Sequence, residues 1–243
     1  MNLLKKLFRR TPERTRPYCA ALIAAAGSST RYGGENKLLQ ELGGMPVLAR
    51  TLLAVDRAES IDEIVIAARE DELLTYAQLC KTFDLQKPVK VVLGGATRTE
   101  SVLRAACEAS PDAALLAVQD GARPLVTSAL IDEVVLAAQQ YHAAAPAIPV
   151  TDTVKVAVNG VVESTPERSK LFAVQTPQVF DAELLKAALQ DALRANAALT
   201  DDCSAVERFG KEVHLTEGDA ENIKITRPLD LIVAEAILQS RGE

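Results

Sequence analysis

The stretch Tyr18-Cys-Ala-Ala-Leu-Ile-Ala-Ala decides the fold, because it is small or apolar along its whole length and leaves no polar face. Such a run is typical of a central strand that is buried on both sides. Directly after it, from Gly27 to Lys37, the chain is rich in Gly, Ser and charged residues. We therefore predict a buried first strand followed by an exposed loop.

Strands and helices alternate after this loop, as the periodicity of the apolar residues indicates. We predict strands at 63–68, 89–93 and 113–118, and helices at 46–55, 71–80, 99–109 and 128–141. We expect Pro46 at the first helical position of one helix and Thr99 as the N-cap of another. The alternation predicts an α/β fold of right-handed βαβ units, with a mainly parallel sheet between helices.

The pattern changes after Ala147. Asn159-Gly160 lies between two β-branched runs, which is a strong hairpin signal. Residues 150–172 are therefore predicted to leave the sheet as an arm. An exposed hairpin with apolar edges tends to find a partner, so we expect a homodimer formed through this arm. Beyond it we expect a return to the sheet at 172–180, helices at 181–192 and 202–209, a strand at 213–216 and a last helix after Thr226.

The composition limits the class of protein. The chain has 243 residues, 48% of them hydrophobic, which is enough for one large α/β domain. Its net charge of −6 argues against nucleic acid as a partner, since general nucleic-acid binders need a dominant basic face. None of the four cysteines lies in a C-x-x-C pair and only two histidines are present, so no zinc or His-rich metal site is indicated. Scattered single thiols favour a cytoplasmic location.

Residues 1–17 are predicted to form a basic N-terminal extension before a single domain at 18–240. The apolar part of this extension is too short for a signal peptide core or a membrane span. It is either a weak membrane-surface helix or a frayed extension, and we favour the second interpretation, with no membrane contact.

The loops with unusual chemistry all follow predicted strands. They are 26–37, 94–101 and 120–123. In parallel sheets, ligands bind beyond the carboxyl ends of the strands, at a topological switch point. The three loops together therefore predict one ligand site at this edge of the sheet.

The first of these loops has the residues that a polyphosphate needs. Ala24-Ala-Ala-Gly-Ser-Ser-Thr-Arg is followed by Lys37. Small residues let backbone N–H groups approach phosphates, and Arg31 and Lys37 supply positive charge at a phosphoryl centre. Neither G-x-x-x-x-G-K-[ST] nor G-x-G-x-x-G is present. On spacing alone, the loop is either a triphosphate-binding turn or a surface loop with two solvated cations.

The A-A-A-G-x-x-x-R…K run resembles the nucleotidyltransferases with a Rossmann-like sheet. Within them, the chain is similar to the 2-C-methyl-D-erythritol 4-phosphate cytidylyltransferase family over nearly all of 18–240. Six further stretches carry the resemblance: Gly94-Gly-Ala-Thr-Arg-Thr-Glu-Ser-Val, Asp120-Gly-Ala-Arg-Pro, Thr151-Asp-Thr-Val-Lys, Gln175-Thr-Pro-Gln-Val-Phe, Thr200-Asp-Asp and Glu221-Asn-Ile-Lys-Ile-Thr. Each is short, but together and in this order they are specific.

The resemblance implies transfer of CMP from CTP to 2-C-methyl-D-erythritol 4-phosphate, an alditol phosphate of the non-mevalonate isoprenoid pathway, with release of pyrophosphate. The acceptor phosphate attacks the α-phosphorus in line and is already ionised, so positioning and charge stabilisation suffice without a general base. Mg²⁺ is the implied cofactor, with Asp120 as its protein ligand. The implied catalytic residues are Arg31, Lys37, Arg168 and Lys224.

The resemblance also implies substrate contacts. For CTP, the implied residues are Ala25, Ala26, Gly27, Gly95, Ala96, Ser101 and Asp120. For the acceptor, they are Thr153, Arg168, Thr176, Lys224 and Arg123. Some roles stay open. Asp120 fits a metal, the ribose or the alditol, Arg123 fits substrate or an internal carboxylate, and Thr176 fits a turn. Arg168 lies in the arm, so in a dimer it could enter the partner's site.

Two positions depart from the family pattern: Asn36 stands where many relatives carry Pro, and Ala96 where an acidic residue is frequent. The nearest rival function is ribitol-5-phosphate cytidylyltransferase, which is similar in fold, loop and nucleotide and differs mainly in the acceptor pocket. The rival from another class is a non-catalytic nucleotide-binding module. The joint presence of the implied cations and Asp120 argues against that module.

Overall fold

The computed structural model describes residues 16–27, 32 and 36–242, so most of the N-terminal extension lies outside the described residues. One mixed sheet of eight strands forms its centre. These strands are β1 (Tyr18–Ala24), β4 (Glu63–Ala68), β5 (Val89–Leu93), β6 (Ala113–Asp120), β7 (Ala143–Pro149), β10 (Phe172–Val174), β11 (Gln178–Asp181) and β12 (His214–Glu217). They are arranged in the order β10-β7-β11-β6-β1-β4-β5, with β12 paired to β7.

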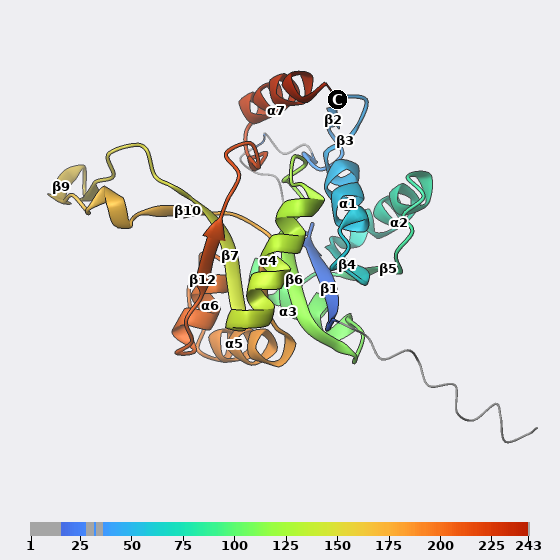
Figure 1. Cartoon of the computed structure of the whole chain (residues 1–243), viewed down its shortest axis with the longest axis horizontal. Helices are drawn as coiled ribbons and strands as arrows, with labels where there is room; N and C mark the ends of the chain where they lie inside the picture. Colours follow the sequence, from blue (N-terminus) through green and yellow to red (C-terminus); the bar gives the residue numbers. More distant parts are fainter. Residues whose placement is uncertain (1–15, 28–31, 33–35, 243) are drawn as a thin grey trace, which may run out of the picture.

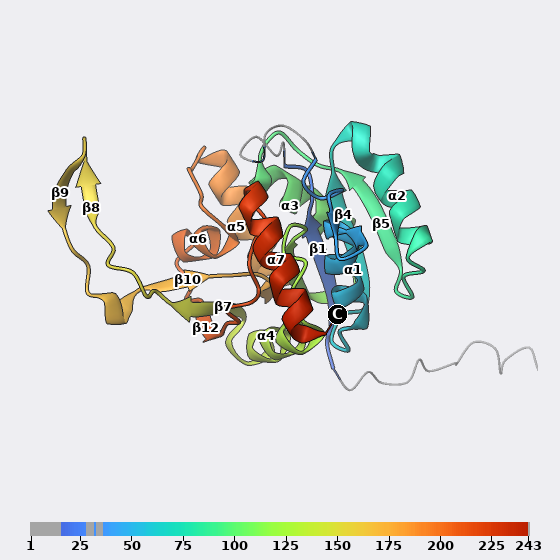
Figure 2. The same ribbon diagram turned by 90° about the horizontal axis from the view of Figure 1, so that it is seen from above.

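Helices cover both faces of the sheet (Figures 1 and 2). In this part of the chain they are α1 (Val47–Arg57), α2 (Leu73–Thr82), α3 (Arg98–Glu108), α4 (Ser128–Tyr141), α5 (Ala182–Arg194), α6 (Asp202–Arg208) and α7 (Pro228–Arg241). None of these helices combines the length and the apolar composition that a membrane span requires. The predicted α/β fold, with a mainly parallel sheet between helices, is confirmed.

The central strand β1 is buried on both sides, as its sequence predicts. Successive side chains of a strand point to opposite faces. Cys19, Ala21 and Ile23 belong to the core that β1 shares with α1, α2, α4 and α7. Ala20 and Leu22 belong to the core shared with α3, α5 and α6. An apolar residue at every position is therefore what this place in the sheet requires.

The register of the sheet brings the predicted loops together. β1 is parallel to β4 and β6, and Ala24 lies opposite both Ala67 and Asp120. β5 continues the sheet, with Leu93 opposite Ala68. The carboxyl ends of β1, β4, β5 and β6 thus share one edge. Since the chain adds β4 and β5 on one side of β1 and then crosses to β6, the switch point lies between β1 and β6.

The strand β7 is not predicted by the sequence pattern. Its segment Ala-Ala-Ala-Pro-Ala-Ile-Pro contains Pro146 and Pro149, which cannot donate to a ladder, and alanine, which has little strand preference. The strand is antiparallel to β10 and β11 and parallel to β12. Pairing with these neighbours holds the segment extended where its own composition does not.

Two predicted helix starts are wrong by one or two residues. Helix α1 begins at Val47, and Pro46 is its N-cap, because Pro46 ends the short strand β3 (Met45–Pro46), which pairs with β2 (Glu41–Leu42). Helix α3 is capped by Thr97 and not by Thr99, since the Thr97 hydroxyl oxygen accepts the Glu100 N–H at 3.1 Å.

The predicted hairpin at Asn159-Gly160 is confirmed. These two residues have φ of 50° and 80° and join β8 (Val156–Val158) to β9 (Val161–Ser164). Every residue of both strands is exposed. The hairpin and its flanking segments, here called the arm (150–172), project away from the sheet in both views (Figures 1 and 2).

Candidate active site

A cavity of about 390 Å³ opens at the carboxyl ends of β1, β5 and β6. This volume is in the range of small-molecule sites. Its described lining residues are Ala24, Ala25, Ala26, Gly27, Tyr32, Lys37, Leu38, Gly95, Ala96, Thr97, Arg98, Ser101, Asp120, Ala122, Lys224 and Thr226. The three loops predicted from the sequence therefore meet in one place, and they are joined there by the segment before α7.

The loop after β1 is fixed by backbone hydrogen bonds to both neighbouring strands. The Ala25 N–H donates to the Ala67 carbonyl at 3.0 Å, and the Gly121 N–H donates to the Ala24 carbonyl at 3.2 Å. The start of the loop is thus held by the sheet itself. The side chains of residues 24–27 are small and line the cavity, which leaves the backbone of this part of the loop accessible to a ligand.

The loop after β5 rests against the loop after β1. Its shape depends on Ser101, whose hydroxyl oxygen accepts the Gly95 N–H at 3.0 Å and whose hydroxyl donates to the Thr97 carbonyl at 2.8 Å. A Cβ atom added at Gly94 would lie 2.7 Å from the Ala26 Cβ and 3.0 Å from the Ser101 Oγ. Only glycine permits this approach, so the two loops are packed to each other at residue 94.

Asp120, the last residue of β6, lies among three cations. Its Oδ2 is 2.7 Å from the Lys224 Nζ and 3.6 Å from the Arg123 Nε, and its Oδ1 is 3.8 Å from an Arg98 guanidinium nitrogen. Burial alone would raise the pKa of Asp120. Lys224, Arg98 and Arg123 outweigh that effect and hold the pKa below its ordinary value. Asp120 is therefore an ionised carboxylate at neutral pH.

Arg98 connects this cluster to the start of α6. Its guanidinium lies 2.7 Å from the carboxylate of Asp202, which is 1% exposed. Burial raises the pKa of Asp202, and the opposing effect of Arg98 does not cancel it. Burial would lower the pKa of Arg98, but Asp202 and Asp120 raise it above its ordinary value. Arg98 thus stays charged between the two carboxylates.

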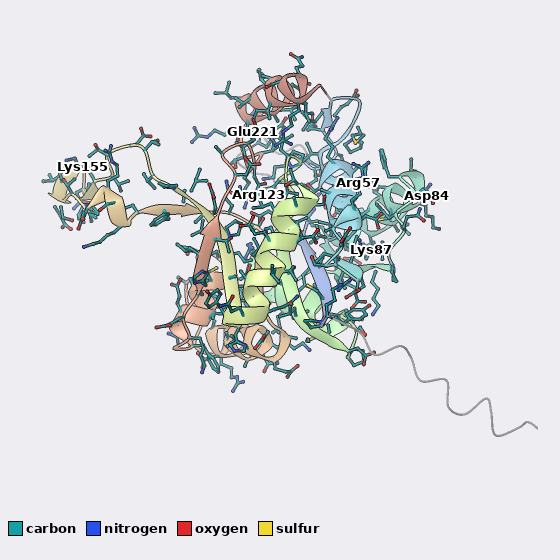
Figure 3. The ribbon with its side chains drawn as sticks, viewed as in Figure 1. Arg57, Asp84, Lys87, Arg123, Lys155 and Glu221 are labelled. Atoms are coloured by element: carbon teal, nitrogen blue, oxygen red, sulfur yellow. The ribbon has the colours of Figure 1, made fainter. Side chains whose placement is uncertain are left out.

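The segment that carries Lys224 is tied to β6. The Ile225 N–H donates to the Ala122 carbonyl at 2.8 Å, and Arg123 donates to the Asn222 carbonyl at 2.6 Å. Asn222 in turn donates to the carbonyl of Thr176 at 3.0 Å. These contacts, most of them buried, fix the place from which Lys224 reaches Asp120 (Figure 3 shows Arg123 at this junction).

Comparison with known proteins identifies the family. The family model for 2-C-methyl-D-erythritol 4-phosphate cytidylyltransferase matches residues 19–240. The chain belongs to this family. It is therefore a cytidylyltransferase, and the resemblance seen in the sequence motifs is confirmed.

Relatives within the 2-C-methyl-D-erythritol 4-phosphate cytidylyltransferase family match along most of their length. Proteins of this name from Caldanaerobacter subterraneus and Bacillus thuringiensis are 44% and 42% identical over 224 and 218 residues, covering 90% and 89% of this chain and 98% and 96% of the relatives. The crystal structure of the 4-diphosphocytidyl-2C-methyl-D-erythritol synthase from Anaerococcus prevotii has a TM-score of 0.82 at 32% identity. It covers 92% of this chain and 96% of that one.

Most of the family's site residues predicted here lie around the cavity. Those among its lining residues are Ala25, Ala26, Gly27, Lys37, Gly95, Ala96, Ser101, Asp120 and Lys224. Arg31 lies outside the described residues. The structure thus brings the predicted CTP-binding residues together with two of the predicted catalytic ones.

Arg123 and Thr176 are predicted acceptor residues that do not line the cavity. Both are buried behind Asp120. Arg123 faces the internal carboxylate of Asp120, and the Thr176 hydroxyl oxygen accepts the Asp120 N–H at 3.1 Å. In this structure, both residues therefore hold Asp120 in place, and their contacts with the acceptor stay a prediction.

Thr153 and Arg168 are predicted acceptor residues that lie in the arm. Arg168 begins the short 3₁₀ helix η4 (Arg168–Lys170) and donates to the Thr151 carbonyl at 3.0 Å. Neither residue lines the cavity, and Lys155 of the arm lies far from Arg123 in Figure 3. Within one chain, the arm residues and the cavity are thus separate.

The pair between Arg98 and Asp202 was not predicted as part of the site. Thr200-Asp-Asp precedes a predicted helix, so Asp201 and Asp202 are both expected as caps, and the structure uses Asp201, whose carboxylate accepts the Ser204 N–H at 2.9 Å. The motif Thr200-Asp-Asp has two acidic residues, and only Asp201 serves as the cap. The second acidic residue, Asp202, was the signal for a further role.

Proposed function

We propose that this chain transfers the cytidylyl group of CTP to 2-C-methyl-D-erythritol 4-phosphate and releases pyrophosphate. The observation that carries the proposal is the cavity at the switch point, where Lys37, Lys224 and Asp120 converge in a chain of this family. The relatives reported above bear this activity in their names.

The nucleotide is held by the two packed loops. The backbone of Ala25, Ala26 and Gly27 lies along the ribose and phosphates, as small residues allow. Gly95 and Ala96 frame the cytosine. Because the Ser101 hydroxyl already binds the loop backbone on two sides, its contribution is to keep the loop in the shape that fits the base.

The chemistry needs charge stabilisation and no proton transfer by a side chain. The acceptor phosphate is ionised at neutral pH, and neither of the two histidines of the chain lines the cavity. Lys37, together with Arg31, stabilises the charge that gathers on the α-phosphorus and on the leaving pyrophosphate. Lys224 is held at the cavity by Asp120 and gives the acceptor phosphate a cationic partner, which directs its oxygen at the α-phosphorus.

A divalent cation, proposed to be Mg²⁺, fits the donor set of the cavity. The described lining carries one carboxylate, that of Asp120, and Mg²⁺ commonly takes one or two carboxylates together with phosphate oxygens. The depressed pKa of Asp120 keeps this carboxylate ionised. A bound Mg²⁺ would neutralise part of the triphosphate charge. Asp120 would hold it, while Arg98 and Arg123 keep the carboxylate from turning away.

The arm is proposed to form a homodimer and to supply Arg168 and Thr153 to the partner's cavity. Val158, Val161 and the rest of β8 and β9 are exposed, and a two-stranded hairpin is not stable alone. A second copy gives these residues a surface to pack on. Helix α7, which begins just beyond the cavity, exposes Leu229 and Ile232 one turn apart, an apolar face that the partner's arm can cover.

One assay tests the proposed function. The purified full-length protein is incubated with Mg²⁺ and CTP, and pyrophosphate release is followed with 2-C-methyl-D-erythritol 4-phosphate or ribitol 5-phosphate. We expect release with the first acceptor and loss of release on adding EDTA. Release with ribitol 5-phosphate alone would overturn the choice of acceptor. No release with either would leave a nucleotide-binding module. We place the reaction in the cytoplasm, which the four free thiols support.

A further inference from the structure

Asn36 directly precedes Lys37, and both ends of its side-chain amide are used. Its Nδ2 donates to the Glu72 Oε1 at 2.5 Å and to the Tyr76 hydroxyl at 3.0 Å. Its Oδ1 accepts the Leu38 N–H at 3.0 Å. One end of the amide is therefore tied to the start of α2, and the other end closes over the backbone of Lys37.

The carboxylate that receives Asn36 is itself rigidly held. Glu72 is 5% exposed and ends η3 (Glu70–Glu72), the short 3₁₀ helix between β4 and α2. It also accepts from Arg69 at 2.8 Å and from the Tyr76 hydroxyl at 2.9 Å. Burial raises the pKa of the Tyr76 phenol, so its hydroxyl keeps the proton that it donates. Both carboxylate oxygens of Glu72 thus have hydrogen-bond partners, which restrains the orientation of this side chain.

The residue on the other side of Lys37 is anchored as well. Leu38 is buried in the core, and its carbonyl accepts the Leu48 N–H of α1 at 2.9 Å. The Leu39 N–H donates to the Asn36 carbonyl at 3.1 Å, which closes a turn around Lys37. Lys37 thus enters the cavity from between two fixed neighbours.

We propose that Asn36, clamped by Glu72 and Tyr76, is a positioning residue that fixes where the ammonium group of Lys37 enters the CTP cavity. The proposal rests on the proposed function, because it requires Lys37 to act on the triphosphate. The clamp needs an amide at residue 36, since the side chain must donate to a carboxylate on one side and accept an N–H on the other.

The substitution Asn36→Asp tests the clamp. It keeps the shape and the acceptor for the Leu38 N–H, but it removes the donor and puts a second carboxylate against Glu72. We expect kcat to fall roughly 100-fold, as for other small displacements of catalytic groups, while the KM for the acceptor stays near the wild-type value. Asn196→Asp is the matched control, because Asn196 is exposed at the end of α5, and we expect wild-type kinetics.

A second substitution separates the clamp from simple damage to the fold. In Asn36→Asp/Glu72→Gln, the amide introduced at residue 72 can donate to the carboxylate introduced at residue 36, and the cluster regains a single negative charge beside Arg69. We expect kcat to recover to within about tenfold of wild type. A double variant as slow as Asn36→Asp, with an unchanged melting temperature, would overturn the proposal.

The last pair of variants tests whether Asn36 acts through Lys37. Lys37→Ala and Lys37→Ala/Asn36→Asp are compared, and equal kcat values are expected, because a side chain that is absent cannot be misplaced. A further loss in the double variant would show that Asn36 acts elsewhere and would overturn the proposal. Wild-type turnover by Lys37→Ala would instead remove Lys37 from the proposed function, and the positioning role would fail with it. These two failures are therefore distinguishable.

Discussion

The cavity and the arm differ in how far their side chains are buried and paired. Around the cavity, polar groups are buried and paired, as in the contacts of Asp120 with Lys224 and of Arg98 with Asp202. In the arm, every residue of both hairpin strands is exposed, including Val161 at 69%. The described cavity takes its shape from contacts within one chain, whereas no described part of the chain covers the hairpin strands of the arm. This difference supports our proposal that the described nucleotide half of the site lies within one chain, whereas the acceptor half depends on a second.

The largest expected effect is that of Lys37→Ala, which tests the role of the cavity in turnover. If Lys37 stabilises charge in the transition state, its loss should lower kcat by roughly 10²–10³-fold, the usual cost of removing one such group. The measurement is pyrophosphate release at saturating CTP and acceptor. Lys211→Ala, at an exposed lysine outside the cavity, is the control. Near-normal kcat for Lys37→Ala would remove it from the mechanism.

Asp120→Asn tests whether the buried ion pairs hold the cavity together. Removing one partner of a buried pair costs about 3 kcal/mol or more, so the free energy of unfolding at pH 7 should fall by that order. Because the pKa of Asp120 is depressed in the folded protein, its contribution is present above its ordinary pKa of about 4 and is lost as the pH falls below it. Urea unfolding at several pH values should show the two proteins converging in acid. A constant difference down to about pH 3 would contradict the assignment.

Arg168→Ala tests whether the arm contributes to acceptor binding. We expect a roughly tenfold higher KM for the acceptor and little change for CTP, because a contact with the acceptor phosphate is lost. An increase confined to CTP would show that Arg168 serves the other substrate.

Mixed dimers show whose cavity Arg168 serves. When Arg168→Ala and Lys37→Ala chains are co-expressed with different tags and purified through both, an arm that serves the partner leaves one intact site of two. At an acceptor concentration well below the wild-type KM, turnover should then be about half of wild type. If Arg168 serves its own chain, neither site has both residues, and turnover at that acceptor concentration should fall to about one twentieth of wild type.

The smallest expected effect is that of Val161→Ala in the arm. Burying fewer methyl groups against the partner should weaken self-association by roughly 1 kcal/mol per subunit, which sedimentation equilibrium can measure. The kinetic constants at high protein concentration should stay unchanged. A monomeric wild-type protein, or an unchanged dimer constant, would remove β9 from the interface.

The sequence predicts what depends on local pattern. The apolar run of β1, the loops at the strand ends and the turn at Asn159-Gly160 each have a signal within a few residues. β7 has none, because alanine and proline adopt a strand there only when other strands pair with them. The residues at strand ends, such as Asp120, could therefore be assigned to the site, whereas the contacts of Asp120 with Lys224 and Arg98 could not be predicted.

The remaining contacts of the site join residues that are far apart in the chain. Arg98 meets Asp202, and Arg123 meets the backbone of Asn222, and no spacing rule connects them. A sequence motif also does not show whether its residues are buried or exposed. The fold buries Arg123 and Thr176 behind Asp120, which their motifs do not indicate, and their contacts with the acceptor remain a prediction.

The contact between Gly94 and Ala26 also limits which substitutions this site can accept during evolution. A single added methyl group at residue 94 would meet the Ala26 Cβ at 2.7 Å and the Ser101 Oγ at 3.0 Å. A substitution at any one of these three positions is therefore accepted only if the side chains at the other two can accommodate it. Variants that escape a CTP-competitive inhibitor would have to arise elsewhere, on parts of the wall with room to vary, and residue 94 would remain glycine as the surrounding sequence drifts.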